Sequence, residues 1–172
     1  MLTYITTASG FCVTAIAASD NTIVAEKSHE GSCGKLTAQY FNNNSLTGPP
    51  SVTRIDPSLD FNWGFGSPAQ GVDSDSISGS WTGFITAPVT GAYTMRIWED
   101  DGSRIYLNGA LVADHWSDAC CTWRTFTYNF TAGQKVPFKA EFAEGGGVAG
   151  IRLHWSYPGQ GSTPVPGSAF SI

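Results

Sequence analysis

Apolar and polar residues alternate with a period of two in five separate stretches of this chain. The alternation runs through residues 36–41, 93–98, 125–130, 135–142 and 151–155. Successive side chains of a β-strand point to opposite faces, so each stretch predicts a strand with one buried and one wet face. Glycine or proline separates the stretches, at a spacing typical of antiparallel sandwiches and barrels. We therefore predict an all-β fold, an antiparallel β-sandwich or barrel with long loops.

Turn residues locate several connections between these strands. Asn108 and Gly109 stand between residues 104–107 and 110–112, and this pair is preferred in the type I′ turn of a hairpin. Residues 48–71 contain four prolines. This stretch predicts a long connection, and its three aromatic residues are expected to fill the core: Phe61, Trp63 and Phe65.

Length and composition favour one secreted domain. The chain has 172 residues, of which 41% are apolar and 13% are charged, and that share of charge is about half of the usual one. We expect a single domain over residues 1–157 and a C-terminal linker or tail over 158–172, which is rich in proline and glycine. The first 18 residues lack a basic segment, and polar residues interrupt them, so we expect them to belong to the mature protein.

The charge balance argues against two classes of partner. Formal net charge is −5, and the nine lysines and arginines are scattered along the chain. Binding to nucleic acid or to an anionic membrane surface requires a basic patch, so neither partner is expected. No run of about 18 apolar residues occurs, so membrane insertion is not expected either.

The chain lacks the short motifs of common catalytic sites. It contains neither a Gly-x-Ser-x-Gly elbow nor a phosphate-binding glycine loop. Its three histidines have no metal-ligand spacing, and nothing singles out a glycosidase pair among its 14 acidic residues. We therefore expect a binding domain and not an enzyme.

Two adjacent carboxylates, Asp100 and Asp101, follow the predicted strand 93–98. One interpretation is turn formation, because the following Gly102 completes an Asp-Gly turn signal. The other is a calcium site, because carboxylates on a loop offer hard oxygen ligands. Adjacent side chains normally diverge, so both can face one ion only if the backbone between them is unusual, for example a cis peptide.

A second loop, residues 144–150, contains four glycines and follows the predicted strand 135–142. It predicts either a flexible hairpin connection or a site where exposed backbone carbonyls ligate calcium beside a closely approaching ligand. Both loops lie at the same end of the sandwich if the strands that precede them, 93–99 and 136–143, run parallel in space.

The four cysteines, Cys12, Cys33, Cys120 and Cys121, lack the Cys-x-x-Cys pairs of a zinc site. The adjacent pair could form a vicinal disulfide, or each member could pair with one N-terminal cysteine. The even number of cysteines and the low charge favour two such bridges, which would tie the N-terminal arm 1–34 to the middle of the domain in an oxidising compartment.

Several motifs, in order along the chain, resemble the PA-fourteen domain family, which is named after the anthrax protective antigen. They occupy residues 35–41, 53–57, 59–63, 80–85, 91–94, 100–106 and 151–155. The resemblance covers about 34–157. It implies a β-sandwich or barrel of secreted proteins, a fold found in adhesins, glycosidases and toxins.

The resemblance also implies a set of calcium ligands. In lectin-like members, two adjacent aspartates joined by a cis peptide bind calcium, which in turn holds sugar hydroxyls, and Asp100 and Asp101 match those positions. The second loop would add the side chain of Glu144, where the family usually has asparagine, and the backbone carbonyls of Gly146 and Val148. Glutamate in place of asparagine is a departure that adds a charge.

Sugar contacts are expected from the same loop and from one aromatic residue. Gly147 and Val148 are placed to contact a bound sugar. Trp116, Trp98 and Trp123 could stack against the apolar face of a sugar ring, although tryptophans often serve as core or sheet-face packing. Trp116, near the cysteine pair, is the first candidate.

The cysteines also resemble those of yeast adhesin domains in this family, where two N-terminal cysteines pair with an adjacent Cys-Cys. The resemblance implies that Cys12 and Cys33 pair with Cys120 and Cys121, and it favours an adhesin-like lectin. Both pairings stay open, and of the two we prefer Cys12–Cys120 with Cys33–Cys121.

These observations lead to two functional hypotheses. The first is a calcium-dependent carbohydrate-binding domain, a monomeric module of a larger secreted or cell-wall adhesin that recognises glycans on a host or neighbouring cell. The second is a structural or accessory module of a secreted glycosidase or toxin, with no sugar site of its own.

Overall fold

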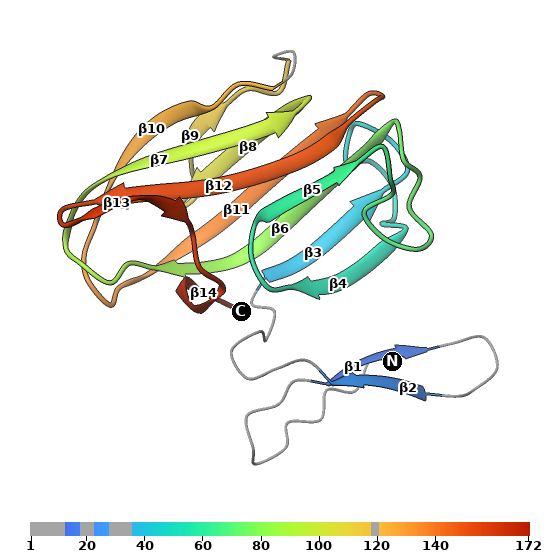
Figure 1. The fold of residues 1–172 in the computed structure, drawn as a ribbon, viewed down its shortest axis with the longest axis horizontal. Helices are drawn as coiled ribbons and strands as arrows, with labels where there is room; N and C mark the ends of the chain where they lie inside the picture. The colour runs from blue at the N-terminus through green and yellow to red at the C-terminus, as the bar shows by residue number, and fades with distance from the viewer. Residues whose placement is uncertain (1–12, 18–22, 28–35, 118–120) are drawn as a thin grey trace.

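The described strands form two antiparallel sheets that face each other, and a separate two-stranded hairpin near the N-terminus (Figure 1). The computed structural model describes residues 13–17, 23–27, 36–117 and 121–172. The described strands form two layers and no closed barrel. The all-β, antiparallel prediction is confirmed, and of its two forms the sandwich is the observed one. In the described part of the chain, no helix is long and apolar enough to cross a membrane.

One layer has five strands. Its order is β10-β7-β12-β13, and β5 pairs with the first half of β12 on the edge where β13 pairs with the second half. The strands are β5 (Asp60–Gly64), β7 (Gly91–Asp100), β10 (Arg124–Phe130), β12 (Ala149–Tyr157) and β13 (Gln160–Pro164).

The other layer has seven strands in the order β4-β3-β6-β11-β8-β9, with β14 on the edge of β6. The predicted turn at Asn108 and Gly109 joins β8 to β9, and both residues have the positive φ that a type I′ turn requires. The strands are β3 (Leu36–Phe41), β4 (Val52–Asp56), β6 (Ile77–Thr86), β8 (Gly102–Leu107), β9 (Ala110–Asp114), β11 (Lys135–Glu144) and β14 (Phe170–Ser171).

The core lies between the two layers and is rich in aromatic rings. Phe61 of β5 stacks on Trp81 of β6 with ring centroids 6.0 Å apart, and Trp63 packs on the core as predicted. Phe65 differs, because its side chain is 80% exposed. The reason is that β5 ends at Gly64, whose φ of +61° turns the chain away before Phe65. The segment 48–71 was predicted to be a connection, but it contains two strands, β4 and β5.

The N-terminal arm contains one hairpin in its described part. Strands β1 (Val13–Ala17) and β2 (Ile23–Lys27) pair antiparallel. Three cysteines, Cys12, Cys33 and Cys120, lie outside the described residues, so the predicted disulfide pairing stays a prediction. The fourth, Cys121, is not a free cysteine.

The C-terminal segment 158–172 differs from the predicted linker. It forms β13, a 3-10 turn over Gly167–Ala169 and β14. Val165 and Phe170 are buried, and the ring of Phe170 packs 5.3 Å from that of Phe138. Proline and glycine are tolerated in β13 because it is an edge strand.

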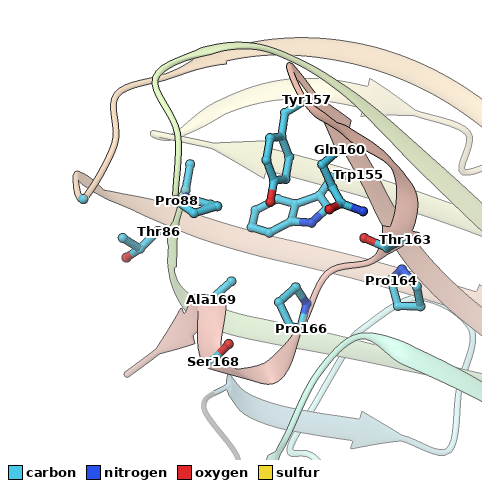
Figure 2. A pocket seen from close by; sticks show the side chains of 12 residues that line it. Thr86, Pro88, Trp155, Tyr157, Gln160, Thr163, Pro164, Pro166, Ser168 and Ala169 are labelled. Atoms are coloured by element: carbon cyan, nitrogen blue, oxygen red, sulfur yellow. The ribbon is translucent and has the colours of Figure 1, made fainter.

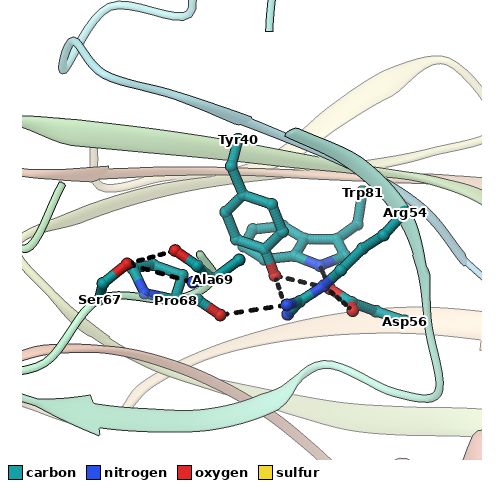
Figure 3. A network of polar contacts seen from close by, with 7 residues as sticks. All are labelled: Tyr40, Arg54, Asp56, Ser67, Pro68, Ala69 and Trp81. Carbon is teal, nitrogen blue, oxygen red and sulfur yellow. Dashed lines mark hydrogen bonds and ion pairs between the residues drawn. The ribbon is translucent and has the colours of Figure 1, made fainter. Parts of the chain in front are cut away.

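A buried carboxylate, Asp56, fixes the region where β3, β4 and β6 meet (Figure 3). It accepts hydrogen bonds from Tyr40 Oη at 2.6 Å, Trp81 Nε1 at 2.8 Å and Arg54 Nε at 2.6 Å. Arg54 also donates to the carbonyl of Pro68 at 3.1 Å, which holds the β5–β6 connection against the sheet. Burial and the neighbouring charge of Asp56 raise the pKa of Tyr40.

Candidate metal and ligand site

The adjacent aspartates lie where strand β7 ends. Strands β7 and β11 run toward the same end of the sandwich, one in each layer (Figure 1). The peptide bond between Asp100 and Asp101 is cis. Asp101 N donates to the carbonyl of Ala143 at 3.1 Å, and its Oδ2 accepts from Gly145 N at 2.8 Å. These bonds bring the pair against the end of β11, so the two predicted loops share one end of the sandwich.

Glu144, the last residue of β11, completes a cluster of three carboxylates. Ligand oxygens of Asp100, Asp101 and Glu144 all lie within 4.8 Å of one another. The Glu144 side chain is 1% exposed, and neither of its oxygens has a hydrogen-bond partner among the described residues. A buried carboxylate without a partner is costly, and a cation beside it would offset that cost.

Electrostatics at this cluster favour a positive ligand. Burial first, then the charges of Asp101 and Asp100, raise the pKa of Glu144 to about 7. The nearby N–H of Gly146 acts in the opposite direction, but it forms no hydrogen bond with either oxygen. Burial and Asp101 also raise the pKa of Asp100. Like-charged carboxylates disfavour one another's ionisation, and this pattern is typical of metal and catalytic sites.

The glycine-rich loop is held by residues that sequence reasoning missed. Asp75 Oδ1 accepts a hydrogen bond from Gly147 N at 2.9 Å. The carbonyl of Gly145 accepts from Ser76 N at 3.1 Å and from Ser76 Oγ at 3.3 Å. Asp75 precedes Gly147 by 72 residues, so the Asp-Ser run at 73–76 carries no local signal of this contact.

An open pocket of about 330 Å³ lies over the acidic cluster. Trp116 contributes to its wall together with Asp101 and Glu144, so the structure brings the predicted aromatic residue to the same place. Gly102 makes this possible, because a Cβ there would lie 2.5 Å from the carbonyl oxygen of Trp116. The guanidinium of Arg104 lies 4.4 Å from the centroid of the Trp116 ring. The pocket is lined by Asn44, Asp101, Trp116, Ser117, Ala143, Glu144 and Gly145.

The other residues predicted for this site lie either in the glycine-rich loop or away from the pocket. Val148 and Gly147 lie in the loop that follows Glu144, half-buried. The ligand roles given to the carbonyls of Gly146 and Val148 stay predictions. Gly147 has φ +115°, so glycine is favoured there and a larger residue would strain the backbone. Trp98 and Trp123 do not line this pocket.

A larger pocket of about 680 Å³ lies elsewhere, between the ends of β6, β12 and β13 (Figure 2). Its wall includes Trp155, Tyr157 and Pro166. No charged side chain lines it, so it lacks the carboxylates that the smaller pocket offers to a cation. Its greater volume therefore does not make it a better candidate for a metal site.

Comparisons with known proteins identify related sequences and folds. A profile of the PA14 domain matches residues 31–168. The anti-sigma-I factor RsgI3 of Acetivibrio thermocellus is 33% identical over 138 residues, which cover 80% of this chain and 21% of that protein. The chain therefore spans about a fifth of the length of this relative.

Solved structures show the same fold. An anti-sigma factor domain-containing protein superposes with a TM-score of 0.78 at 32% identity, covering 82% of this chain and 48% of the other. A PA14 sugar-binding domain from an RTX adhesin superposes with a TM-score of 0.67 at 17% identity, covering 81% of this chain and 98% of the other.

Proposed function

Because this chain belongs to the PA14 domain family, we propose that it is a calcium-dependent glycan-binding domain. Asp100, Asp101 and Glu144 would hold the ion, and the bound calcium would present open coordination positions to vicinal sugar hydroxyls. The observation that carries the proposal is the buried Glu144 carboxylate, which has no hydrogen-bond partner among the described residues and lies beside the aspartate pair.

The donor set fits a hard divalent cation. Calcium takes six to eight oxygen ligands and accepts carboxylates, backbone carbonyls and hydroxyls together. Three carboxylates supply the charge, and the carbonyls of Gly146 and Val148 are proposed to add to them. The sugar-binding domain of an RTX adhesin has the same fold, which supports carbohydrate as the partner class.

The size of the pocket favours weak binding. One monosaccharide buries few atoms, so affinity near millimolar is expected for each domain. Several copies on one surface would add avidity. We propose that the domain is a non-catalytic, monomeric module located outside the cell, with two disulfides tying its N-terminal arm to the Cys120–Cys121 pair.

We propose two candidate roles for a protein that contains this domain. An adhesin is one. The other is an anti-sigma factor, favoured by the 33% identity to RsgI3 and by the similar anti-sigma factor structure. In that setting the same site would report the presence of a glycan instead of attaching a cell to it.

Glu144→Gln is expected to weaken calcium binding at least about tenfold and to make the calcium-free domain more stable. The amide removes a buried charge from a cluster of like charges, and its N–H groups can donate to the neighbouring carboxylates. Calorimetric titration with calcium, and thermal unfolding in chelator, measure the two effects. A matched control is Glu141→Gln, a carboxylate of the same strand that already pairs with Lys139. Unchanged calcium affinity in Glu144→Gln would remove the residue from the site.

Val148→Trp is expected to change or abolish glycan binding while the free energy of unfolding changes by less than about 1 kcal/mol. The residue lies on a loop at the end of the sandwich and is only half-buried, so bulk there affects an approaching ligand more than the core. Val89→Trp, in the β6–β7 connection, is the matched control, because its side chain is 38% exposed. Wild-type glycan affinity in Val148→Trp would place the sugar elsewhere.

A further inference from the structure

The outer face of the five-stranded sheet carries a continuous stripe of aromatic and cationic side chains. Ile97 and Leu153 point into the core, so their neighbours on β7 and β12 point outward. The register places Arg152 opposite Trp98 and His154 opposite Arg96. We call the five side chains on this face the outer stripe: Arg96, Trp98, Trp123, Arg152 and His154.

Side chains within the outer stripe contact one another across β7, β12 and Trp123, which directly precedes β10. The guanidinium of Arg96 lies 4.8 Å from the centroid of the Trp123 ring, and the ring of His154 lies 4.5 Å from it. The guanidinium of Arg152 lies 5.8 Å from the Trp98 ring. All five side chains are partly exposed. Such contacts orient the rings while leaving part of each accessible.

A glycine makes room for Trp98 on the sheet. A Cβ at Gly150 would lie 2.8 Å from Cζ3 of Trp98, so the indole lies directly against the backbone of β12. Gly150 therefore keeps the ring close to the sheet surface. Flat aromatic surfaces suit the apolar C–H faces of sugar rings.

The charge of the outer stripe is opposite to that of the whole chain. Formal net charge of the chain is −5, yet this face has two arginines. Arg152 is paired with Asp60 at 3.6 Å, whereas no ion pair joins Arg96 to a carboxylate of the described residues. Arg96 contacts Ser162 Oγ at 3.5 Å instead. Burial lowers the pKa of His154, so its imidazole can act as a neutral hydrogen-bonding group.

We infer that the outer stripe is a second glycan-binding surface, selective for polysaccharides that bear carboxylates. Trp98 and Trp123 would stack against sugar rings, and Arg96 would pair with a carboxylate of the glycan. A guanidinium presents paired donors that match a carboxylate. This surface needs no metal, because its charge already complements the ligand. It is independent of the acidic cluster, whose carboxylates would repel such a ligand when calcium is absent.

Affinity gel electrophoresis of the whole chain in excess chelator tests this surface apart from any calcium site. Polygalacturonate in the gel is the probe, and its fully methyl-esterified form has the same backbone without the charge. Wild type is expected to be retarded by polygalacturonate and at least about fivefold less by the ester. No retardation by polygalacturonate would overturn the proposal, and so would equal retardation by the ester, which would indicate a neutral-glycan surface.

Three variants connect the retardation to named side chains. Arg96→Gln and Trp123→Ala are each expected to weaken binding at least about fivefold. Trp98→Ala should act in the same way, and its melting curve shows whether the fold is retained. Two controls lie elsewhere: Lys135→Gln, a cation on the other layer, and Phe65→Ala, an exposed ring on a loop. Wild-type retardation in both Arg96→Gln and Trp123→Ala, or equal weakening in the controls, would contradict the inference.

Discussion

Replacing Asp56 by alanine is expected to lower the free energy of unfolding by about 3–5 kcal/mol. Asp56 is 2% exposed and accepts hydrogen bonds from Tyr40, Trp81 and Arg54. Alanine would leave the Arg54 charge without its carboxylate and two buried donors without an acceptor. Removing one partner of a buried ion pair costs far more than the pair itself contributes, because the remaining charge is left uncompensated.

Urea denaturation measures the loss, with the slope of the transition checked against wild type. The control is Asp60→Ala, since the ion pair of Asp60 with Arg152 joins side chains that are 36% and 40% exposed. Exposed pairs contribute about 0–1 kcal/mol. Equal destabilisation by the two substitutions would show that the Asp56 network does not hold the sheet.

Calcium at about 100 times its dissociation constant is expected to stabilise the wild-type domain by about 2.7 kcal/mol. For a domain of this size the melting temperature then rises by roughly 5–10 °C. The physical reason is that the ion would bind only the folded chain, where the ends of β7 and β11 bring three carboxylates together.

Asp101→Asn should abolish this calcium-dependent shift, because the amide carries no charge and offers one oxygen. Asp73→Asn is the matched control, an exposed aspartate outside the cluster. Thermal unfolding with excess calcium and with chelator measures both variants. A shift that persists in Asp101→Asn, or identical melts of wild type in the two conditions, would argue against the metal site.

Local sequence signals predicted the parts of the fold that local physics determines. Period-two alternation located five strands, and the Asn108-Gly109 turn formed as expected because its chemistry depends on only two residues. The prediction for segment 158–172 was wrong, because composition alone cannot show that a segment rich in proline and glycine will add edge strands. The prediction for Phe65 was wrong for a similar reason, since the backbone turn at Gly64 decides its direction.

Some features of the candidate site could likewise be predicted from the sequence, and others could not. The adjacent aspartates were visible in the sequence, and the resemblance implied their cis peptide, which the structure has. The absence of a partner for Glu144 among the described residues was not visible, because it depends on how two sheets meet. Likewise, the contact of Asp75 with Gly147 joins residues 72 positions apart.

The calcium-dependent glycan site is tested most directly by the binding of wild type to an array of neutral glycans, in calcium and in chelator. We expect at least one glycan class to be bound in calcium, and this binding to disappear in chelator and in Asp101→Asn. Neutral glycans reduce the contribution of a carboxylate-binding surface on the outer sheet face, and binding in chelator measures what remains of it. Binding that is unchanged by chelator and by Asp101→Asn, or no binding to any neutral glycan in calcium, would show that the acidic cluster is not a calcium-dependent glycan site.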